Sequence, residues 1–155
     1  MYNAYPSGYA PYTQRCGPFK KTDLKQDILN YFHDWVSTRL SFSRDLILGL
    51  EIWKKEEEVH SATITFAGFR NLEFKDYQQT PLIETENLET IKNLSIDRWL
   101  QRSKEINDGV EIEFIGGNDF TDSHIGALSF NYNSISITID NERCLTENAV
   151  ERLLN

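Results

Sequence analysis

Alternating apolar and polar residues recur in several short segments of this 155-residue chain, and they constrain its fold more than any other feature. In VEIEFIGG, for example, Val110, Ile112 and Phe114 alternate with two glutamates. Successive side chains of a strand point to opposite faces of a sheet, so this period places the apolar residues on a core face and the polar residues in water. The chain is therefore expected to form antiparallel sheet with one covered face.

The same alternation marks the other expected strands. DLILGLEIWK, VHSATITF and FRNLEFKD follow one another and are predicted to form a meander. Ile47 and Trp53 lie opposite the leucines of the first run, which indicates a strand covered on both sides. Tyr132 and Asn133 are expected to form a two-residue hairpin turn, because asparagine tolerates a positive φ. The segment LETIKNLSIDRWLQRSKEI fits a helix and a strand alike, and a strand near residues 93–99 is favoured.

Two helices are expected outside the strand-like region. From about residue 23 to residue 40, apolar residues recur at spacings of three and four, and Thr22 or Asp23 can serve as the N-cap. This apolar stripe consists of Leu24, Ile28, Tyr31, Phe32, Trp35 and Val36. A short second helix is predicted to close the chain, capped by Thr146 and with Val150, Leu153 and Leu154 facing inward.

The N-terminal residues stand apart from this pattern. Residues 1–21 hold four of the seven tyrosines and three of the four prolines, and they show neither period. An extended arm is expected there, either as a disordered leader or with its tyrosines packed on the domain or a partner. Residues 22–155 are predicted to form a single domain. The predicted fold class is α+β, mainly an antiparallel sheet of about six strands with an N-terminal amphipathic helix and a short C-terminal helix.

The negative charge of the chain is confined to one segment. There are 24 acidic and 16 basic residues, which gives a net charge of −8. Eight of the acids and none of the bases lie between residues 105 and 142, so the remainder of the chain is neutral. This balance argues against binding to nucleic acid or to an anionic membrane surface. The segment is either a solvated face or a docking surface for a basic protein.

The sequence carries none of the common motifs of enzymes or cofactor sites, and no cofactor is expected. Asp119, Asp122 and His124 form the best cluster for catalysis, since a carboxylate near a histidine can orient a general base. Cys16 and Cys144 are expected to be reduced thiols. A cytoplasmic location is expected, because no secretory signal is found and no apolar run reaches the roughly 18 residues that span a bilayer.

The middle and the end of the chain resemble a known class of proteins. SATITFAGFRNLEF, VEIEFIGG and GALSFNYNSISITI are similar to small bacterial β-rich immunity proteins, which sit beside the toxins of contact-dependent and polymorphic toxin systems. The resemblance covers residues 45–140 and is one of pattern. It implies a protein that is not an enzyme and that neutralises a basic toxin, such as a nuclease, by occluding it with an acidic surface.

The expected interface lies in the acidic segment, where carboxylates would steer a basic partner and aromatic residues would anchor it. The predicted partner-binding residues are Glu111, Glu113, Asp119, Phe120, Asp122 and Tyr132. Two alternatives remain open. One is an enzyme with an unrecognised site at Asp119, Asp122 and His124, and the other is a homo-oligomeric or viral assembly subunit whose N-terminal arm crosses to a neighbour.

Overall fold

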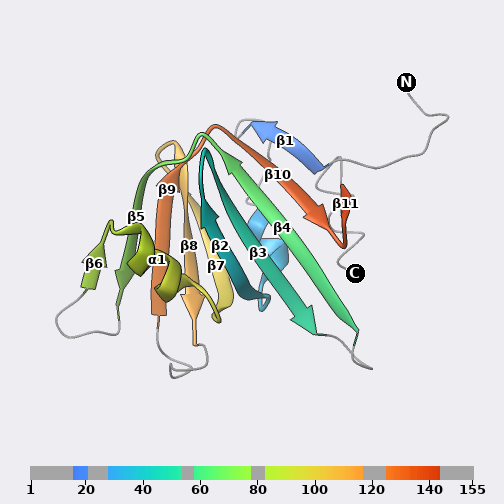
Figure 1. Ribbon diagram of the computed structural model, residues 1–155, viewed down its shortest axis with the longest axis horizontal. Helices are drawn as coiled ribbons and strands as arrows, with labels where there is room; N and C mark the ends of the chain where they lie inside the picture. Colours follow the sequence, from blue (N-terminus) through green and yellow to red (C-terminus); the bar gives the residue numbers. More distant parts are fainter. Residues whose placement is uncertain (1–15, 21–27, 54–57, 78–82, 117–124, 144–155) are drawn as a thin grey trace.

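The computed structural model describes residues 16–20, 28–53, 58–77, 83–116 and 125–143, and all the strands among them belong to one antiparallel sheet (Figure 1). The strand order is β1-β10-β4-β3-β2-β7-β8-β9-β5-β6, and β11 pairs with β10 beside β1. The strands are β1 (Cys16–Lys20), β2 (Val36–Phe42), β3 (Asp45–Trp53), β4 (Val59–Ala67), β5 (Arg70–Asp76), β6 (Ile83–Thr85), β7 (Trp99–Ile106), β8 (Gly109–Ile115), β9 (Ile125–Asn131), β10 (Ser134–Ile139) and β11 (Glu142–Arg143).

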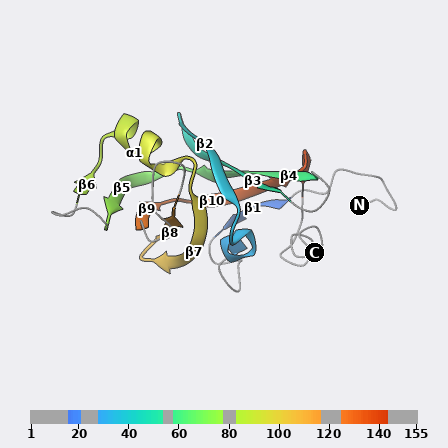
Figure 2. The ribbon, with the colours of Figure 1, turned by 90° about the horizontal axis from the view of Figure 1, so that it is seen from below.

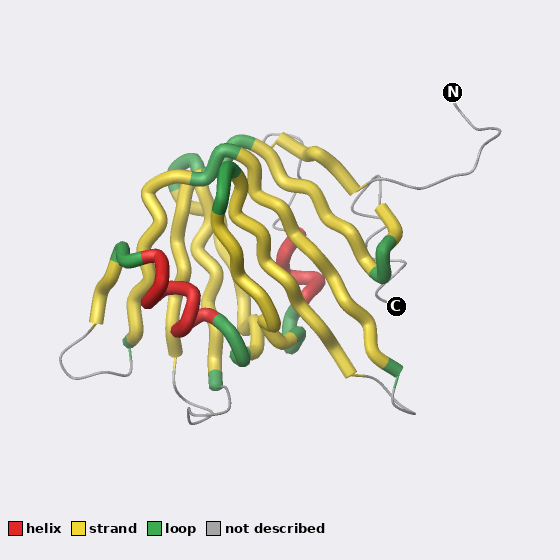
Figure 3. The backbone as a smooth tube through the Cα atoms, viewed as in Figure 1, coloured by secondary structure: helices red, strands yellow, loops and turns green. Residues whose placement is uncertain are grey.

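The described residues contain one α-helix, α1 (Leu88–Ser95), and one 3-10 helix, η2 (Ile28–Phe32) (Figure 3). The expected α+β fold with about six strands and two flanking helices is therefore wrong, because the described chain is mostly antiparallel sheet with eleven strands. The predicted C-terminal helix lies outside the described residues. The sheet also takes in five residues of the predicted N-terminal arm, since β1 pairs with β10.

The helix expected over residues 23–40 is replaced by the 3-10 helix and strand β2. Asp34 has a φ of 70°, and this left-handed backbone prevents the helical turn from continuing. After Trp35 the chain forms strand β2, which pairs with β3, a partner that local apolar spacing cannot reveal. Residues of the predicted apolar stripe still belong to the core. Phe32 and Trp35 are buried, and their rings pack edge to face with centroids 5.1 Å apart.

The ambiguous segment between β6 and β8 contains a helix followed by a strand. Asn87 caps α1, since its side-chain oxygen accepts a hydrogen bond from the Thr90 N–H at 3.0 Å. The helix extends to Ser95, and Asp97, with a φ of 59°, turns the chain into β7. The strand predicted near residues 93–99 is therefore wrong, because α1 continues through residues 93–95, the chain turns at Asp97, and β7 begins only at Trp99.

We divide the sheet into two parts at the junction of β2 and β7, where the register holds the pair Val36 and Trp99. Backbone hydrogen bonds flank this pair, for example from the Ser37 N–H to the Arg98 carbonyl at 2.7 Å and from the Leu100 N–H to the Trp35 carbonyl at 2.8 Å. We call β1, β10, β4, β3 and β2 the wing, and β7, β8, β9, β5 and β6 the curl. Figure 2 shows β1, β10, β4 and β3 as a nearly flat layer, with β2 crossing it and β7 and β8 lying below it. Helix α1 contacts both β2 and β9, which are not neighbours in the sheet, and so closes the curl.

The chain crosses between the two parts at one end of the sheet. It passes from wing to curl between β4 and β5 and returns between β9 and β10, where the Asn133 N–H donates to the Ala67 carbonyl at 2.8 Å. The predicted meander fails at its third strand, since β5 pairs with β6 and β9 rather than with β4. Tyr132 and Asn133 form a crossing rather than a hairpin turn, because β9 and β10 are not paired.

One hydrophobic core lies between the wing and the curl. Phe66 from β4 meets Phe130 from β9 edge to face, with ring centroids 4.8 Å apart. Tyr132, at the crossing, packs its ring 5.2 Å from that of Phe66. These aromatic contacts hold the two parts of the sheet together.

A buried charge lies beneath α1. Arg98 and Asp76 are 0 % and 1 % exposed, and the Arg98 Nη2 lies 3.9 Å from the Asp76 Oδ2. The guanidinium also lies 5.5 Å from the centre of the Phe74 ring. Burial lowers the pKa of Arg98, while the charge of Asp76 acts to raise it. Ser37 ties this region to β2, since its hydroxyl accepts from the Arg98 N–H at 3.2 Å.

Candidate functional site

The two glutamates predicted to bind a partner are paired within the sheet. Lys104 Nζ lies 3.1 Å from Glu111 Oε1, and Arg102 Nε lies 3.2 Å from Glu113 Oε1. Each pair joins residues that face each other across β7 and β8. Arg102 and Lys104 come just before the acidic segment in the sequence, so the net charge of that segment does not include them. The fold nevertheless places them beside its glutamates. Much of the negative field of β8 is therefore neutralised locally.

The remaining predicted contacts lie in the core or outside the described residues. Tyr132 is 8 % exposed and packs against Phe66, which leaves little of its ring for a partner. Asp119, Phe120 and Asp122 lie outside the described residues, as does His124, so the structure does not place the predicted acidic loop or the alternative catalytic cluster.

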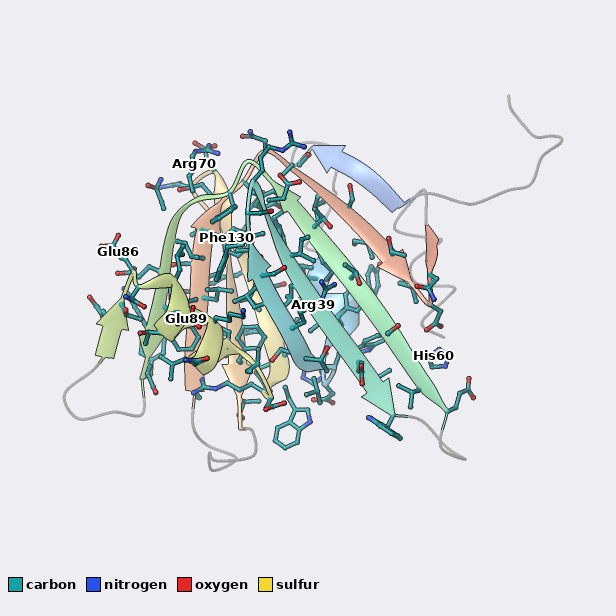
Figure 4. The ribbon with its side chains drawn as sticks, viewed as in Figure 1. Arg39, His60, Arg70, Glu86, Glu89 and Phe130 are labelled. Carbon is teal, nitrogen blue, oxygen red and sulfur yellow. The ribbon has the colours of Figure 1, made fainter. Side chains whose placement is uncertain are left out.

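Asp140, another acid of that segment, forms a clasp with His60 at the end of the wing (Figure 4). His60 Nδ1 lies 2.6 Å from Asp140 Oδ2, and His60 Nε2 lies 2.8 Å from Glu58 Oε1. Asp140 also accepts from the Ser61 N–H at 3.0 Å. The hydrogen bond that the His60 ring donates to the Asp140 carboxylate, supported by Glu58, raises the pKa of His60. Burial acts to raise the pKa of Asp140, but the hydrogen bonds from His60 and Ser61 hold it below its ordinary value.

We expect the stabilisation that the clasp provides to be lost as the pH rises above neutrality. The pKa of His60 is higher in the folded chain than its unfolded value of about 6.5. Its contribution is therefore fully present below about pH 6.5 and is lost as the pH rises through the folded pKa. Melting temperatures measured between pH 6 and pH 9 should fall more in the wild type than in His60→Gln.

A matched control is His33→Gln, which removes an exposed histidine that lies 3.2 Å from Asp34. This variant should keep the pH dependence of the wild type, because His33 lies outside the clasp. Equal falls in melting temperature for the wild type and His60→Gln would show that the clasp does not contribute.

The side of the wing that faces away from the core is lined mainly by small polar residues. Residues paired across antiparallel strands share a face, so the registers give two rows that run across β2, β3, β4 and β10. The first row is Arg39, Gly49, Thr63 and Thr138, and the second is Ser41, Ile47, Thr65 and Ser136. The alternate residues, such as Leu48, Ile64 and Ile137, are buried in the core. We call this side the open face.

No described helix covers the open face over β3, β4 and β10. Figures 1 and 2 show α1 over the curl and η2 on the opposite side of the wing. The face is also flat across these strands, because most of its side chains are short. Ser and Thr alternations in β4 and β10 are visible in the sequence, but Thr63 and Thr138 are too far apart along the chain for the pattern to show that they pair.

Exposed apolar residues lie at one end of the open face. Trp53 and Val59 are 67 % and 39 % exposed and face each other at the ends of β3 and β4. Trp53 was expected to be covered, and its exposure corrects that prediction for this end of β3. Trp99 is 39 % exposed and pairs with Val36 across β7 and β2. Its ring packs on Gly116, where an added Cβ would lie 2.4 Å from the Trp99 Cζ3.

Arg39 lies on β2, at one side of the open face (Figure 4). An added Cβ on Gly49 would lie 3.2 Å from the Cβ of Arg39 and 3.5 Å from its Nε, so the arginine side chain lies across the glycine. Among the described residues, Arg39 has no ion pair or side-chain hydrogen bond. Its guanidinium is therefore available to an anionic group.

The described part of the chain contains no group of three or more His, Cys, Asp or Glu residues placed to hold a metal ion. Nor does that part contain a helix that is both long and apolar enough to cross a membrane. Comparisons of the chain with protein-family models, with curated proteins and with solved structures found no match.

Proposed function

We propose that this chain is a protein-binding protein and that the open face is its interface. The single observation that carries the proposal is a sheet face that no described helix covers and that combines exposed Trp53 with an exposed Arg39. Tryptophan and arginine are enriched among the residues that dominate binding energy in protein interfaces. A flat surface suits a macromolecule better than a small ligand, since small-molecule sites are concave.

That the partner is a basic toxin, which this chain would neutralise, stays a prediction. The acidic residues that would steer such a toxin include Glu111, Glu113 and Asp140, and each lies against a basic side chain of this chain. A basic partner would have to compete with these pairs. We therefore favour the open face over the acidic segment as the binding surface.

The proposal is tested by placing a photo-activated cross-linking residue at Thr63, in the middle of the open face, and at Lys92, on the exposed side of α1. The two variants would be produced in the cells that naturally make the protein. We expect a protein adduct from the Thr63 position and little from Lys92. Adding Arg39→Glu to the Thr63 variant should reduce the adduct several-fold, because reversing a charge within an interface is strongly unfavourable.

Equal labelling from the two positions, or an adduct that is insensitive to Arg39→Glu, would argue against the open face as the interface. Thermal unfolding of each variant would show whether a lost adduct reflects lost binding or lost folding.

A further inference from the structure

Charges of both signs stand unpaired on the open face. Arg39, Glu51 and Asp45 form no side-chain ion pair with another described residue. Arg39 faces Gly49, and Glu51 lies two residues further along β3 on the same face. Such diagonal neighbours have Cβ atoms about 7–8 Å apart, within reach of long side chains. The arginine lies across Gly49 instead, so neither charge is paired within the described part of the chain.

A surface that bears both charges is complementary to itself. In a two-fold symmetric pair, the same patch is used by both molecules, so a contact from one residue to another always occurs twice. Arg39 of one copy would meet Glu51 of the other copy, and the symmetry would form the same ion pair a second time. A partner of a single charge would satisfy only one of these two residues.

The size and shape of the open face also fit a second copy. Gly49, Thr63, Thr65 and Ser136 are small, so two such faces can approach to the roughly 10 Å spacing of packed sheets. Four strands about 4.8 Å apart and about 25 Å long give roughly 1,000 Å² over two copies, which is the lower limit for a specific interface. Trp53 and Val59 at the end of the face add apolar area.

We propose that the partner bound by the open face is a second copy of this chain, in a face-to-face pair joined by Arg39 and Glu51. The proposal rests on the proposed function of the open face as a protein interface. Because the pair is held by exposed charges over a hydroxyl-lined face, its affinity should fall as salt is raised.

The test is a charge exchange followed by sedimentation of the full chain over a range of concentrations. We expect the wild type to form dimers, and Arg39→Glu and Glu51→Arg to weaken dimerisation by roughly tenfold or more, because each places like charges together. The double variant Arg39→Glu/Glu51→Arg should restore most of the wild-type affinity, since it exchanges the two charges. Glu105→Arg is the control, because it makes the same charge change at an exposed residue of the curl.

A chain that sediments as a monomer at every concentration would overturn the proposal, and so would a double variant no better than the single ones. Melting temperatures close to the wild-type value would show that the variants are folded. A monomer that still gives Arg39-dependent adducts with a different protein would overturn only the second-copy proposal. A monomer without such adducts would overturn the proposed function as well.

Discussion

Replacing Asp76 with alanine is expected to lower the free energy of unfolding by about 3–5 kcal/mol, the usual result of removing one partner of a buried ion pair. Arg98 is 0 % exposed and lies 3.9 Å from the Asp76 carboxylate. The variant would keep a buried guanidinium and remove the opposite charge beside it. Urea unfolding followed by circular dichroism would measure the change.

A double variant, Asp76→Leu/Arg98→Met, separates the effect of charge from that of packing. Apolar residues of similar volume often replace a buried ion pair at little loss of stability, so this variant should be more stable than Asp76→Ala. The control is Asp45→Ala, which removes a partly exposed carboxylate with no ion pair among the described residues. It should change stability by less than about 0.5 kcal/mol. A similarly small effect of Asp76→Ala would show that the buried pair is not needed.

Replacing Phe66 with alanine is expected to lower the free energy of unfolding by about 3–5 kcal/mol, because it opens a cavity between wing and curl. Phe66 is 0 % exposed and contacts the rings of Phe130 and Tyr132. The variant should unfold at a lower urea concentration, as measured by circular dichroism. The control is Thr65→Ala, at the neighbouring residue of β4, whose side chain lies on the open face. It should lower the free energy of unfolding by less than about 1 kcal/mol, within the range of strand propensities.

The pairing of Phe66 with Phe130 can be tested by a double-mutant cycle. If the edge-to-face contact joins the two parts of the sheet, Phe66→Ala and Phe130→Ala should be coupled by about 0.5–1.5 kcal/mol. Additive effects of the two substitutions would mean that each ring stabilises its own part of the sheet separately.

The strands with clear alternation could be predicted from the sequence, and so could the side of each that faces the core. Leu46, Leu48 and Leu50 were expected on one face of their strand, and all three are buried. The same alternation placed Ile64 and Phe66 in the core, where they are found. These predictions succeed because the side-chain period of a strand depends only on neighbouring residues. Where apolar spacing fits both periods, as in residues 88–99, the sequence could not decide.

The candidate interface could not be predicted in the same way. The charge distribution predicts a binding surface in the acidic segment, but the fold pairs Glu111 with Lys104 and Glu113 with Arg102. The open face is not evident in the sequence, because Thr63 and Thr138 meet only through the pairing of β4 with β10. A single serine or threonine of this face carries no signal in the sequence. These residues form a surface only because strand pairing places them next to one another.

The sequence by itself therefore determined which residues of its clear strands are buried, and the tertiary structure decided which strands are neighbours. Local alternation sets the two faces of a strand, whereas pairing joins backbone groups that are distant along the chain. For that reason only the structure shows that β5 pairs with β9 rather than with β4, and that β2 replaces part of a predicted helix. Likewise, only the structure shows that Arg39 lies beside hydroxyl residues on a face that no described helix covers.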